Sequence, residues 1–232
     1  MKVYYKSSED MHEIKDGETS LIVTSPPYPM IKKWDYLFGA DFNEIHKKLI
    51  PIWKECYRIL CEGGIACINI GDATRSINKE FTCWPNYARI INYCMKIGFT
   101  PLIPIFWKKI SNRPNAFLGS GFLPPNAYIS QDCEYIMILR KGKLRKFPTK
   151  DPNRIKSSYT KEERDKWFQQ VWEIPGAKGA KQDSNFPEEI PNRLIRMFSV
   201  IEDLVVDPFS GTGTTGRIAE KLDRKFIGYE TN

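Results

Sequence analysis

A glycine-containing turn near the end of the chain constrains the fold more than any other feature of the sequence. Two apolar runs, residues 204–207 and 225–229, flank a helical pattern over residues 212–222. Gly211 and Gly213 lie between the first run and the helical pattern, where they allow a tight turn that can approach a ligand closely. A strand, a glycine turn, a helix and a second strand together predict a βαβ unit of the Rossmann type.

The acids around this turn indicate the kind of ligand. Glu230 follows the second strand, nineteen residues after Gly211, where an acid can accept hydrogen bonds from both hydroxyls of a ribose. Asp207 stands at the turn, and the lysine of a Walker phosphate loop is missing. An acid there favours a cationic group, such as the ammonium of S-adenosylmethionine, and opposes the phosphates of an oxidoreductase nucleotide. An ordinary βα turn with a surface glutamate is the alternative.

A second turn follows the apolar run 20–24 and has the sequence Thr24-Ser25-Pro26-Pro27-Tyr28. Its prolines fix the backbone and remove two N–H donors, so the local carbonyl groups remain as bare acceptors. The serine adds a hydroxyl and the tyrosine a flat ring, and together these groups can hold an amino group on a planar base. A tight turn that only ends a strand is the alternative.

The remaining patterns predict one α/β domain with an insertion. Strands are expected at residues 3–6, 20–24, 65–70, 102–107 and 134–139, and helices at 42–60, 86–96 and 188–198. Their alternation predicts a parallel sheet. The apolar runs are too short to span a membrane and the N-terminus lacks the apolar stretch of a signal peptide, so a cytoplasmic location is expected. The six cysteines form no CxxC pair and only two histidines are present, so we expect reduced cysteines in the core and no metal site.

The positive charge is concentrated in one segment. Residues 140–166 contain eleven Lys or Arg and four Asp or Glu, whereas the other 205 residues carry 24 of each sign. The segment therefore accounts for the whole formal net charge of +7, and Phe147 and Tyr159 lie within it. A basic segment with interleaved aromatic residues favours a polyanion such as nucleic acid. A solvated, Lys-rich loop is the alternative.

With these motifs in this order, the chain resembles a known family. Ser25–Tyr28 resembles the catalytic motif, and Asp207–Thr215 the cofactor motif, of the DNA amino-methyltransferases, which methylate cytosine N4 or adenine N6. The catalytic motif precedes the basic segment and the cofactor motif, an order that resembles the circularly permuted β group. Five longer strings resemble the N4-cytosine branch: TSPPYPMIKKWD, GGIACINIGDATR, FLGSGFLPPNAY, EYIMILRKG and EERDKWFQQVWEIPG.

The resemblance implies an α/β fold with the Rossmann-like sheet of an S-adenosylmethionine-dependent methyltransferase, circularly permuted, with an inserted target-recognition region. Residues 1–139 would form the catalytic half of the domain, residues 140–185 the basic target-recognition region, and residues 186–232 the cofactor-binding half. The permutation break would fall between the last strand and the first. Lys6-Ser7-Ser8 stands where the family often has Gly-Asp, so Glu9 or Asp10 would have to replace an expected contact to the cofactor adenine.

The resemblance also implies roles for individual residues. The catalytic set is Ser25, Pro26, Pro27, Tyr28 and Asp72. The cofactor-binding set is Thr24, Phe186, Pro187, Asp207, Pro208, Phe209, Ser210, Gly211, Thr212, Gly213, Thr214, Thr215 and Glu230. The DNA-binding set is Lys32, Lys33, Trp34, Lys141, Lys143, Arg145 and Lys146. The loop 112–128 is a further candidate for DNA contact, a helix or turn cap is the alternative role for Asp72, and no metal ligand is implied.

The implied reaction transfers a methyl group from S-adenosyl-L-methionine to N4 of a flipped cytosine in double-stranded DNA by direct displacement. Ser25 Oγ and the Pro26 carbonyl would accept the two amino hydrogens, and Tyr28 would stack on the base. In this family Ser at the first position tends to go with cytosine and Asp with adenine, so N6-adenine methylation is the first alternative. An RNA or protein methyltransferase, a nucleotide-dependent oxidoreductase and a non-catalytic DNA-binding module are the others. A cognate restriction endonuclease is the functional partner to expect, no membrane is involved, and monomer and homodimer both stay open.

Overall fold

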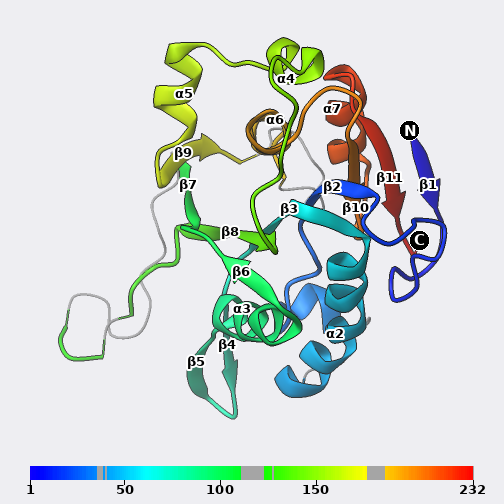
Figure 1. The fold of residues 1–232 in the computed structure, drawn as a ribbon. Helices are drawn as coiled ribbons and strands as arrows, with labels where there is room; N and C mark the ends of the chain where they lie inside the picture. Colours follow the sequence, from blue (N-terminus) through cyan, green and yellow to red (C-terminus); the bar gives the residue numbers. More distant parts are fainter. Residues whose placement is uncertain (36–38, 40, 111–122, 127, 177–185, 232) are drawn as a thin grey trace.

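The computed structural model describes residues 1–35, 39, 41–110, 123–126, 128–176 and 186–231, with a nine-stranded sheet at the centre (Figure 1). Within these residues the strand order is β1-β11-β10-β2-β3-β8-β7-β9, and β6 pairs with β8. The strands are β1 (Lys2–Tyr4), β2 (Thr19–Thr24), β3 (Leu60–Ile70), β6 (Phe99–Pro101), β7 (Ile105–Ile110), β8 (Cys133–Lys141), β9 (Val171–Pro175), β10 (Leu204–Asp207) and β11 (Lys225–Tyr229). A separate hairpin pairs β4 (Ala73–Ile77) with β5 (Glu80–Trp84).

Helices cover both faces of the parallel half of the sheet, which comprises β1, β11, β10, β2 and β3. Ile22 of β2 packs in the core beneath α2 (Phe42–Ile59) and α3 (Asn86–Ile97). Its neighbours Leu21 and Val23 point to the other face and pack with α6 (Glu189–Phe198) and α7 (Thr214–Lys221). All six residues of β2 are buried, as a strand between two helical layers requires (Figure 1).

The expected parallel sheet is found in β1, β11, β10, β2 and β3, but the whole sheet is mixed, because β8 runs antiparallel to β3, β6 and β7. An antiparallel neighbour needs no helical crossover, and the sequence between β7 and β8 has no helical pattern. The strand expected at residues 102–107 is also displaced. Pro101 and Pro104 cannot donate to a ladder, so β6 ends at the first of them and β7 begins after the second.

Part of the expected target-recognition region, residues 140–185, joins the main sheet. After β8 the chain forms α4 (Pro152–Lys156) and α5 (Lys161–Trp167), and β9 then pairs in parallel with β7. Trp172 of β9 is buried and donates a hydrogen bond to the Trp167 carbonyl at 2.9 Å. Arg196 of α6 holds Glu163 of α5 through two hydrogen bonds. The described part of the expected target-recognition region, residues 140–176, is therefore continuous with the sheet and α6.

Three of the six cysteines, Cys56, Cys67 and Cys94, are buried in the core, where burial raises the pKa of each thiol. Cys83 is exposed, so the expectation of core cysteines holds for half of them and fails for this one. In the part of the chain that the structure describes, no helix is long and apolar enough to cross a membrane.

Candidate active site at the carboxyl edge of the sheet

The two sequence motifs meet at one edge of the sheet. Because β2, β3, β10 and β11 run parallel, their carboxyl ends lie at the same edge, which is where open α/β sheets bind ligands. At this edge β2 leads into Ser25, β3 into Gly71 and β10 into Pro208. Segments that are far apart in the sequence therefore surround one site.

A direct contact joins the turn expected to be catalytic, Thr24–Tyr28 (here called the catalytic turn), to the turn expected to bind the cofactor, Asp207–Thr215 (the cofactor turn). Thr24 Oγ1, at the end of β2, donates a hydrogen bond of 2.6 Å to Asp207 Oδ1, at the end of β10. The Asp207 carboxylate also accepts from the Phe209 N–H at 3.1 Å and is hydrogen-bonded by Thr215. Burial nevertheless raises the pKa of Asp207 to about 6. A cation bound beside this carboxylate would restore its charge, which fits the ligand that the sequence predicts.

The glycine turn has the backbone that its sequence predicts. Gly211 has a φ of +50° and Gly213, the N-cap of α7, a φ of +76°, both in the left-handed region that favours glycine. The Ser210 N–H donates to the Tyr229 carbonyl at 2.8 Å, so β11 holds the turn in place. Arg217 of α7 donates to the Thr212 carbonyl at 2.6 Å and stiffens the other side.

Glu230 lies against this turn. Its Oε2 accepts a hydrogen bond of 2.6 Å from the Gly211 N–H, and its Oε1 accepts one of 2.9 Å from the Thr231 N–H. The structure thus brings Glu230 and the glycine turn together, with both carboxylate oxygens oriented by backbone donors.

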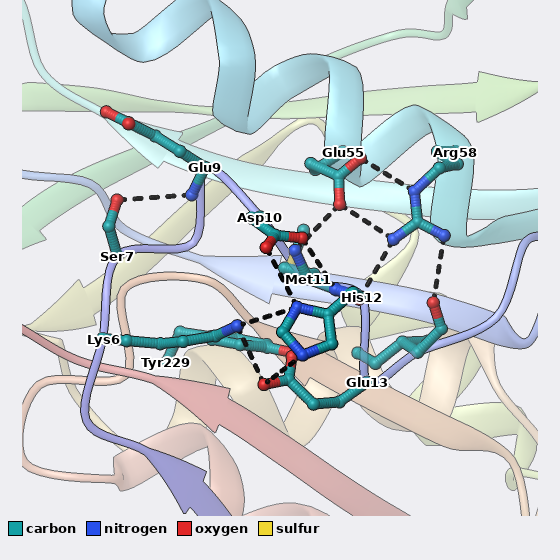
Figure 2. A network of polar contacts seen from close by, with 11 residues as sticks. Lys6, Ser7, Glu9, Asp10, Met11, His12, Glu13, Glu55, Arg58 and Tyr229 are labelled. Carbon is teal, nitrogen blue, oxygen red and sulfur yellow. Dashed lines mark hydrogen bonds and ion pairs between the residues drawn. The ribbon is translucent and has the colours of Figure 1, made fainter.

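The loop after β1 supports the cofactor turn from the N-terminal side. Ser8 is buried, and its hydroxyl donates to the Pro208 carbonyl at 2.9 Å. Ser8 therefore stands at the turn in the stretch that departs from the family's Gly-Asp. Asp10, one of the two residues considered as a replacement, is exposed and hydrogen-bonded to His12 at 2.9 Å (Figure 2), and this bond lowers the pKa of Asp10.

A polar network holds the same loop on α2 and β11 (Figure 2). Arg58 of α2 donates to the carbonyls of Met11 and Ile14, each at 3.0 Å. The Tyr229 hydroxyl donates to Glu13 at 3.0 Å, and Lys6 pairs with Glu13 at 2.8 Å. The loop that carries Ser8 is therefore held by side-chain contacts at several points.

The catalytic turn is anchored through Tyr28. The Tyr28 hydroxyl donates to Glu134 Oε2 at 2.6 Å and accepts from Asn69 Nδ2 at 2.6 Å. Asn69 Nδ2 also donates to Glu134 Oε2 at 2.8 Å, and Lys109 forms an ion pair with the same carboxylate. Burial and the neighbouring Glu134 carboxylate raise the pKa of Tyr28 well above its usual value, so the phenol stays protonated.

Sequence reasoning missed Asn69 and Glu134. Asn69 lies inside the apolar run of β3 and Glu134 near the start of β8, and both are buried. A lone amide or carboxylate in a buried strand needs a polar partner, which was the available signal. The sequence could not show that β3 pairs with β8. This pairing brings the two side chains together at the carboxyl edge of the sheet.

Asp72, the fifth residue of the expected catalytic set, receives a hydrogen bond of 3.0 Å from the Tyr87 N–H in the first turn of α3. Burial raises the pKa of Asp72, and this hydrogen bond works against that rise. These contacts of the carboxylate are those of a helix cap, which was the alternative role. A catalytic role for Asp72 stays a prediction.

Asn86 connects the loop after β2 to the loop after β3 through hydrogen bonds to both. Its Nδ2 donates to the carbonyls of Pro29 and Gly71, at 3.0 Å each. His46 of α2 lies 3.1 Å from Asn86 Oδ1 through Nε2, which must therefore carry the proton. Both side chains are fully buried, and burial lowers the pKa of His46 to about 4.

The residues expected to support the methionine end of the cofactor lie at the start of α6. The Pro187 carbonyl accepts from the Ile190 N–H at 3.0 Å, and Phe186 packs against the core on the α6 and α7 side. The preceding residues, 177–185, lie outside the described part of the chain, as does most of the candidate DNA loop 112–128.

The expected DNA-binding residues separate into two places. Lys32, Lys33 and Trp34 form a short 3-10 helix (η1, Lys32–Trp34) just after the catalytic turn, and Asp35 behind it pairs with Arg75 of the hairpin at 2.8 Å. This first group lies at the catalytic edge.

The second group lies at the opposite edge. β8 runs antiparallel to β3, so Lys141 at its end is level with the start of β3 and donates to the Arg58 carbonyl at 3.2 Å. Arg145 pairs with Asp203, which immediately precedes β10. Lys143 and Lys146 flank Arg145 in the chain. These four residues are therefore close to the amino ends of the strands and distant from the catalytic turn.

Comparison with known proteins gives consistent matches along the chain. The family model for N6/N4 DNA methylases, described as DNA methylase, matches residues 19–232. The type II methyltransferase M.MjaI of Methanocaldococcus jannaschii is 52% identical, and the alignment covers 99% of this chain and 86% of the relative. The type II methyltransferase M.MthZI of Methanothermobacter thermautotrophicus is 41% identical, with 99% and 72% covered.

Solved structures agree with these relatives. TTHA0409 from Thermus thermophilus, in complex with S-adenosyl-L-methionine, matches with a TM-score of 0.82 and 32% identity over 100% of this chain and 88% of that one. The cytosine-N4-specific PvuII DNA methyltransferase matches with a TM-score of 0.70 and 21% identity over 99% and 81%, which shows a shared fold.

Proposed function

As the chain belongs to the N6/N4 DNA methylase family, we propose that it methylates the N4 amino group of a cytosine in double-stranded DNA, with S-adenosyl-L-methionine as methyl donor. The observation that carries the proposal is the hydrogen bond between Thr24 and Asp207. It joins the turn that would bind the amino group to the turn that would bind the ribose and the cationic tail. Both turns therefore lie at one edge of the sheet, as transfer between two bound molecules requires.

The donor set fits S-adenosyl-L-methionine. The Glu230 carboxylate would accept the ribose hydroxyls, and the negative charge of the buried Asp207 carboxylate would favour a cationic tail beside the turn. Phe186 and Pro187 would support the methionine end. When bound, this cofactor supplies an electrophilic methyl group on a sulfonium.

The catalytic turn would prepare the amino group. Ser25 Oγ and the Pro26 carbonyl accept its two hydrogens, which turns the nitrogen lone pair out of conjugation with the ring. Tyr28 provides the aromatic face for the flipped base. As the new C–N bond would form, the methyl–sulfur bond would break and leave a neutral thioether, and the amino group would lose one proton, for which Asp72 is the candidate acceptor. Correct positioning then supplies much of the rate.

Cytosine is proposed over adenine because Ser25 occupies the first position of the catalytic motif, where the family tends to have Asp for adenine. The permuted order of the β group is supported by β1, which pairs in parallel with β11 with Lys2 opposite Ile227. Two relatives are named type II methyltransferases, and on that basis we propose a cognate restriction endonuclease as the functional partner. DNA would approach the catalytic edge, where Lys32 and Trp34 flank the proposed base site.

The test is to incubate the protein with S-adenosyl-L-methionine carrying a labelled methyl group and with PCR-amplified DNA, which carries no methylation. The DNA is digested to nucleosides, and the labelled nucleoside is identified by chromatography and mass spectrometry. We expect N4-methylcytosine. N6-methyladenine would overturn the choice of base. In a parallel incubation with RNA, label in the RNA together with none in the DNA would overturn the choice of nucleic acid.

A further inference from the structure

The Tyr28 hydroxyl is bound more tightly than stacking on a base would need. Its two short hydrogen bonds, to Glu134 and from Asn69, both measure 2.6 Å. Ser25 Oγ also lies 3.4 Å from it, which is at the limit of a hydrogen bond. A phenol that only presented its ring to a ligand could have been a phenylalanine.

Glu134 is the centre of this cluster. One of its oxygens accepts from both Tyr28 and Asn69, and the other pairs with Lys109 of β7. Glu134 is only 8% exposed, and a buried carboxylate is costly unless it is fully paired. The three partners come from three different segments, so the carboxylate connects β3, β7 and the catalytic turn.

The backbone leaves room for this arrangement at Gly71. A Cβ at Gly71 would lie 3.0 Å from the Tyr28 ring and 3.3 Å from Glu134 Cγ. The ring edge and the glutamate stem therefore occupy the space of the absent side chain. The Tyr28 ring is held on one side by packing and at its tip by hydrogen bonds.

From this geometry we infer that Glu134 is a positioning residue for methyl transfer: its carboxylate fixes the plane of the Tyr28 ring on which the target base stacks. The inference rests on the stacking role proposed for Tyr28. Glu134 acts through the tyrosine hydroxyl and does not itself touch the base. Asn69 and Lys109 hold the carboxylate within hydrogen-bond distance of that hydroxyl.

A double-mutant cycle tests the inference on the whole protein, with kcat and the KM for S-adenosyl-L-methionine measured on PCR-amplified DNA. We expect Glu134→Ala to lower kcat about 10- to 100-fold, since misplacement by about 1 Å has an effect of that size, with an unchanged KM for S-adenosyl-L-methionine. Glu134→Gln keeps an acceptor for the phenol and should retain most of kcat. In the Tyr28→Phe background, Glu134→Ala should lower kcat no further.

Equal losses of kcat from Glu134→Ala in both backgrounds would overturn the inference, because a merely structural role does not depend on the hydroxyl. Wild-type kcat in Glu134→Ala would do the same. If Glu134→Ala does not fold, Glu134→Leu, which fills the same space but offers no acceptor, takes its place in the cycle, and its effect on kcat must again disappear in the Tyr28→Phe background. Glu163→Gln, which breaks an ion pair with Arg196 far from Tyr28, is the matched control and should keep wild-type kcat.

Failure of this inference can be distinguished from failure of the proposed function. No methyl transfer to DNA by the wild-type protein would contradict the proposed function, whereas transfer by the wild type with additive variants would contradict only the role of Glu134. N6-methyladenine as product would change the base and leave the inference intact, because both bases present a ring face to Tyr28.

Discussion

Arg145 donates two hydrogen bonds to Asp203, at 2.6 and 2.7 Å, and fastens the basic segment to the amino end of β10. Asp203 is buried, and this pairing raises the pKa of Arg145. A Cβ at Gly63 would collide with the Arg145 backbone, so this part of the segment fits closely onto the start of β3. Arg145 therefore has a structural role, which separates it from Lys143 and Lys146 in the experiments below.

Replacing Arg145 should destabilise the protein. Arg145→Gln leaves the Asp203 carboxylate buried without its cation, which should lower the free energy of unfolding by about 3 kcal/mol. Urea denaturation followed by circular dichroism measures the change. Arg154→Gln, in the same segment but exposed, is the control and should stay within about 0.5 kcal/mol of the wild type. Equal effects of the two variants would contradict a structural role for Arg145.

Neutralising the other basic residues tests whether this edge contacts DNA. Lys143→Gln combined with Lys146→Gln should weaken DNA binding and reduce the slope of log K against log salt by about 2, since each phosphate contact contributes about 0.9. The affinity for S-adenosyl-L-methionine should not change. Fluorescence anisotropy with labelled duplex DNA at several salt concentrations gives the slope. An unchanged slope would restrict DNA contact to the catalytic edge.

The buried carboxylate of Asp207 should lower the stability of the unliganded protein at neutral pH, and it should strengthen ligand binding. Its pKa is raised to about 6, above the unfolded value, so its contribution to stability is fully present below about pH 4 and is lost as the pH rises through 6. Asp207→Asn removes this loss and should stabilise the unliganded protein by about 3 kcal/mol at pH 8, at about 1.4 kcal/mol per pKa unit. The same variant should bind S-adenosyl-L-methionine at least about 10-fold more weakly, since a charge-assisted contact is removed.

Thermal unfolding at pH 4 and pH 8 and titration calorimetry with S-adenosyl-L-methionine measure both effects of Asp207→Asn. A variant that is less stable than the wild type at pH 8, or that binds the cofactor with full affinity, would count against this role of the carboxylate.

His46 should make the protein sensitive to acid. Its pKa is lowered to about 4, so the unfolded chain takes up the proton first, and stability is fully present above pH 6.5 and is lost as the pH falls towards 4. The loss should approach 3 kcal/mol, at about 1.4 kcal/mol per pKa unit. His46→Gln keeps a side-chain donor for Asn86 and should flatten this part of the profile. Urea denaturation between pH 4 and 8 compares the two proteins, and parallel profiles would contradict the assignment.

The catalytic turn should be needed for chemistry and not for cofactor binding. Ser25→Ala removes an acceptor for the amino group, and Tyr28→Ala removes the stacking face, so the double variant should lose methyl transfer by at least about 100-fold. Its affinity for S-adenosyl-L-methionine, measured by calorimetry, should stay within a factor of about 3, because Thr24 and Asp207 are intact. Methyl transfer at the wild-type rate would show that this turn is not the catalytic motif.

The sequence predicted the parts of the fold whose signals are local. The strands 204–207 and 225–229 lie where the apolar runs placed them, and the turn between them has left-handed glycines. The direction of β8 was not predictable in the same way. An apolar run indicates a strand, but the absence of a helical crossover before it was the only sign of antiparallel pairing.

The site shows the same division. Motifs that are contiguous in sequence, such as Thr24–Tyr28, could be identified before the fold was known. Asn69, Asn86 and Glu134 could not, because their role depends on which strands and helices become neighbours. The charge of the basic segment was visible in the sequence, but its location was not. Only the antiparallel course of β8 places residues 141–146 at the edge away from the catalytic turn.

The two hydrogen bonds from Asn86 have a consequence for the free energy of base capture. They hold the carbonyls of Pro29 and Gly71 at a fixed spacing, so the loops beside the proposed base site are already positioned in the absence of DNA. Extruding a base from the duplex already costs a few kcal/mol. A loop that had to become ordered at the same moment would add about 1 kcal/mol or more for each residue that it fixed. With these loops positioned during folding, that entropic cost falls on the folding of the chain and not on the encounter with the substrate.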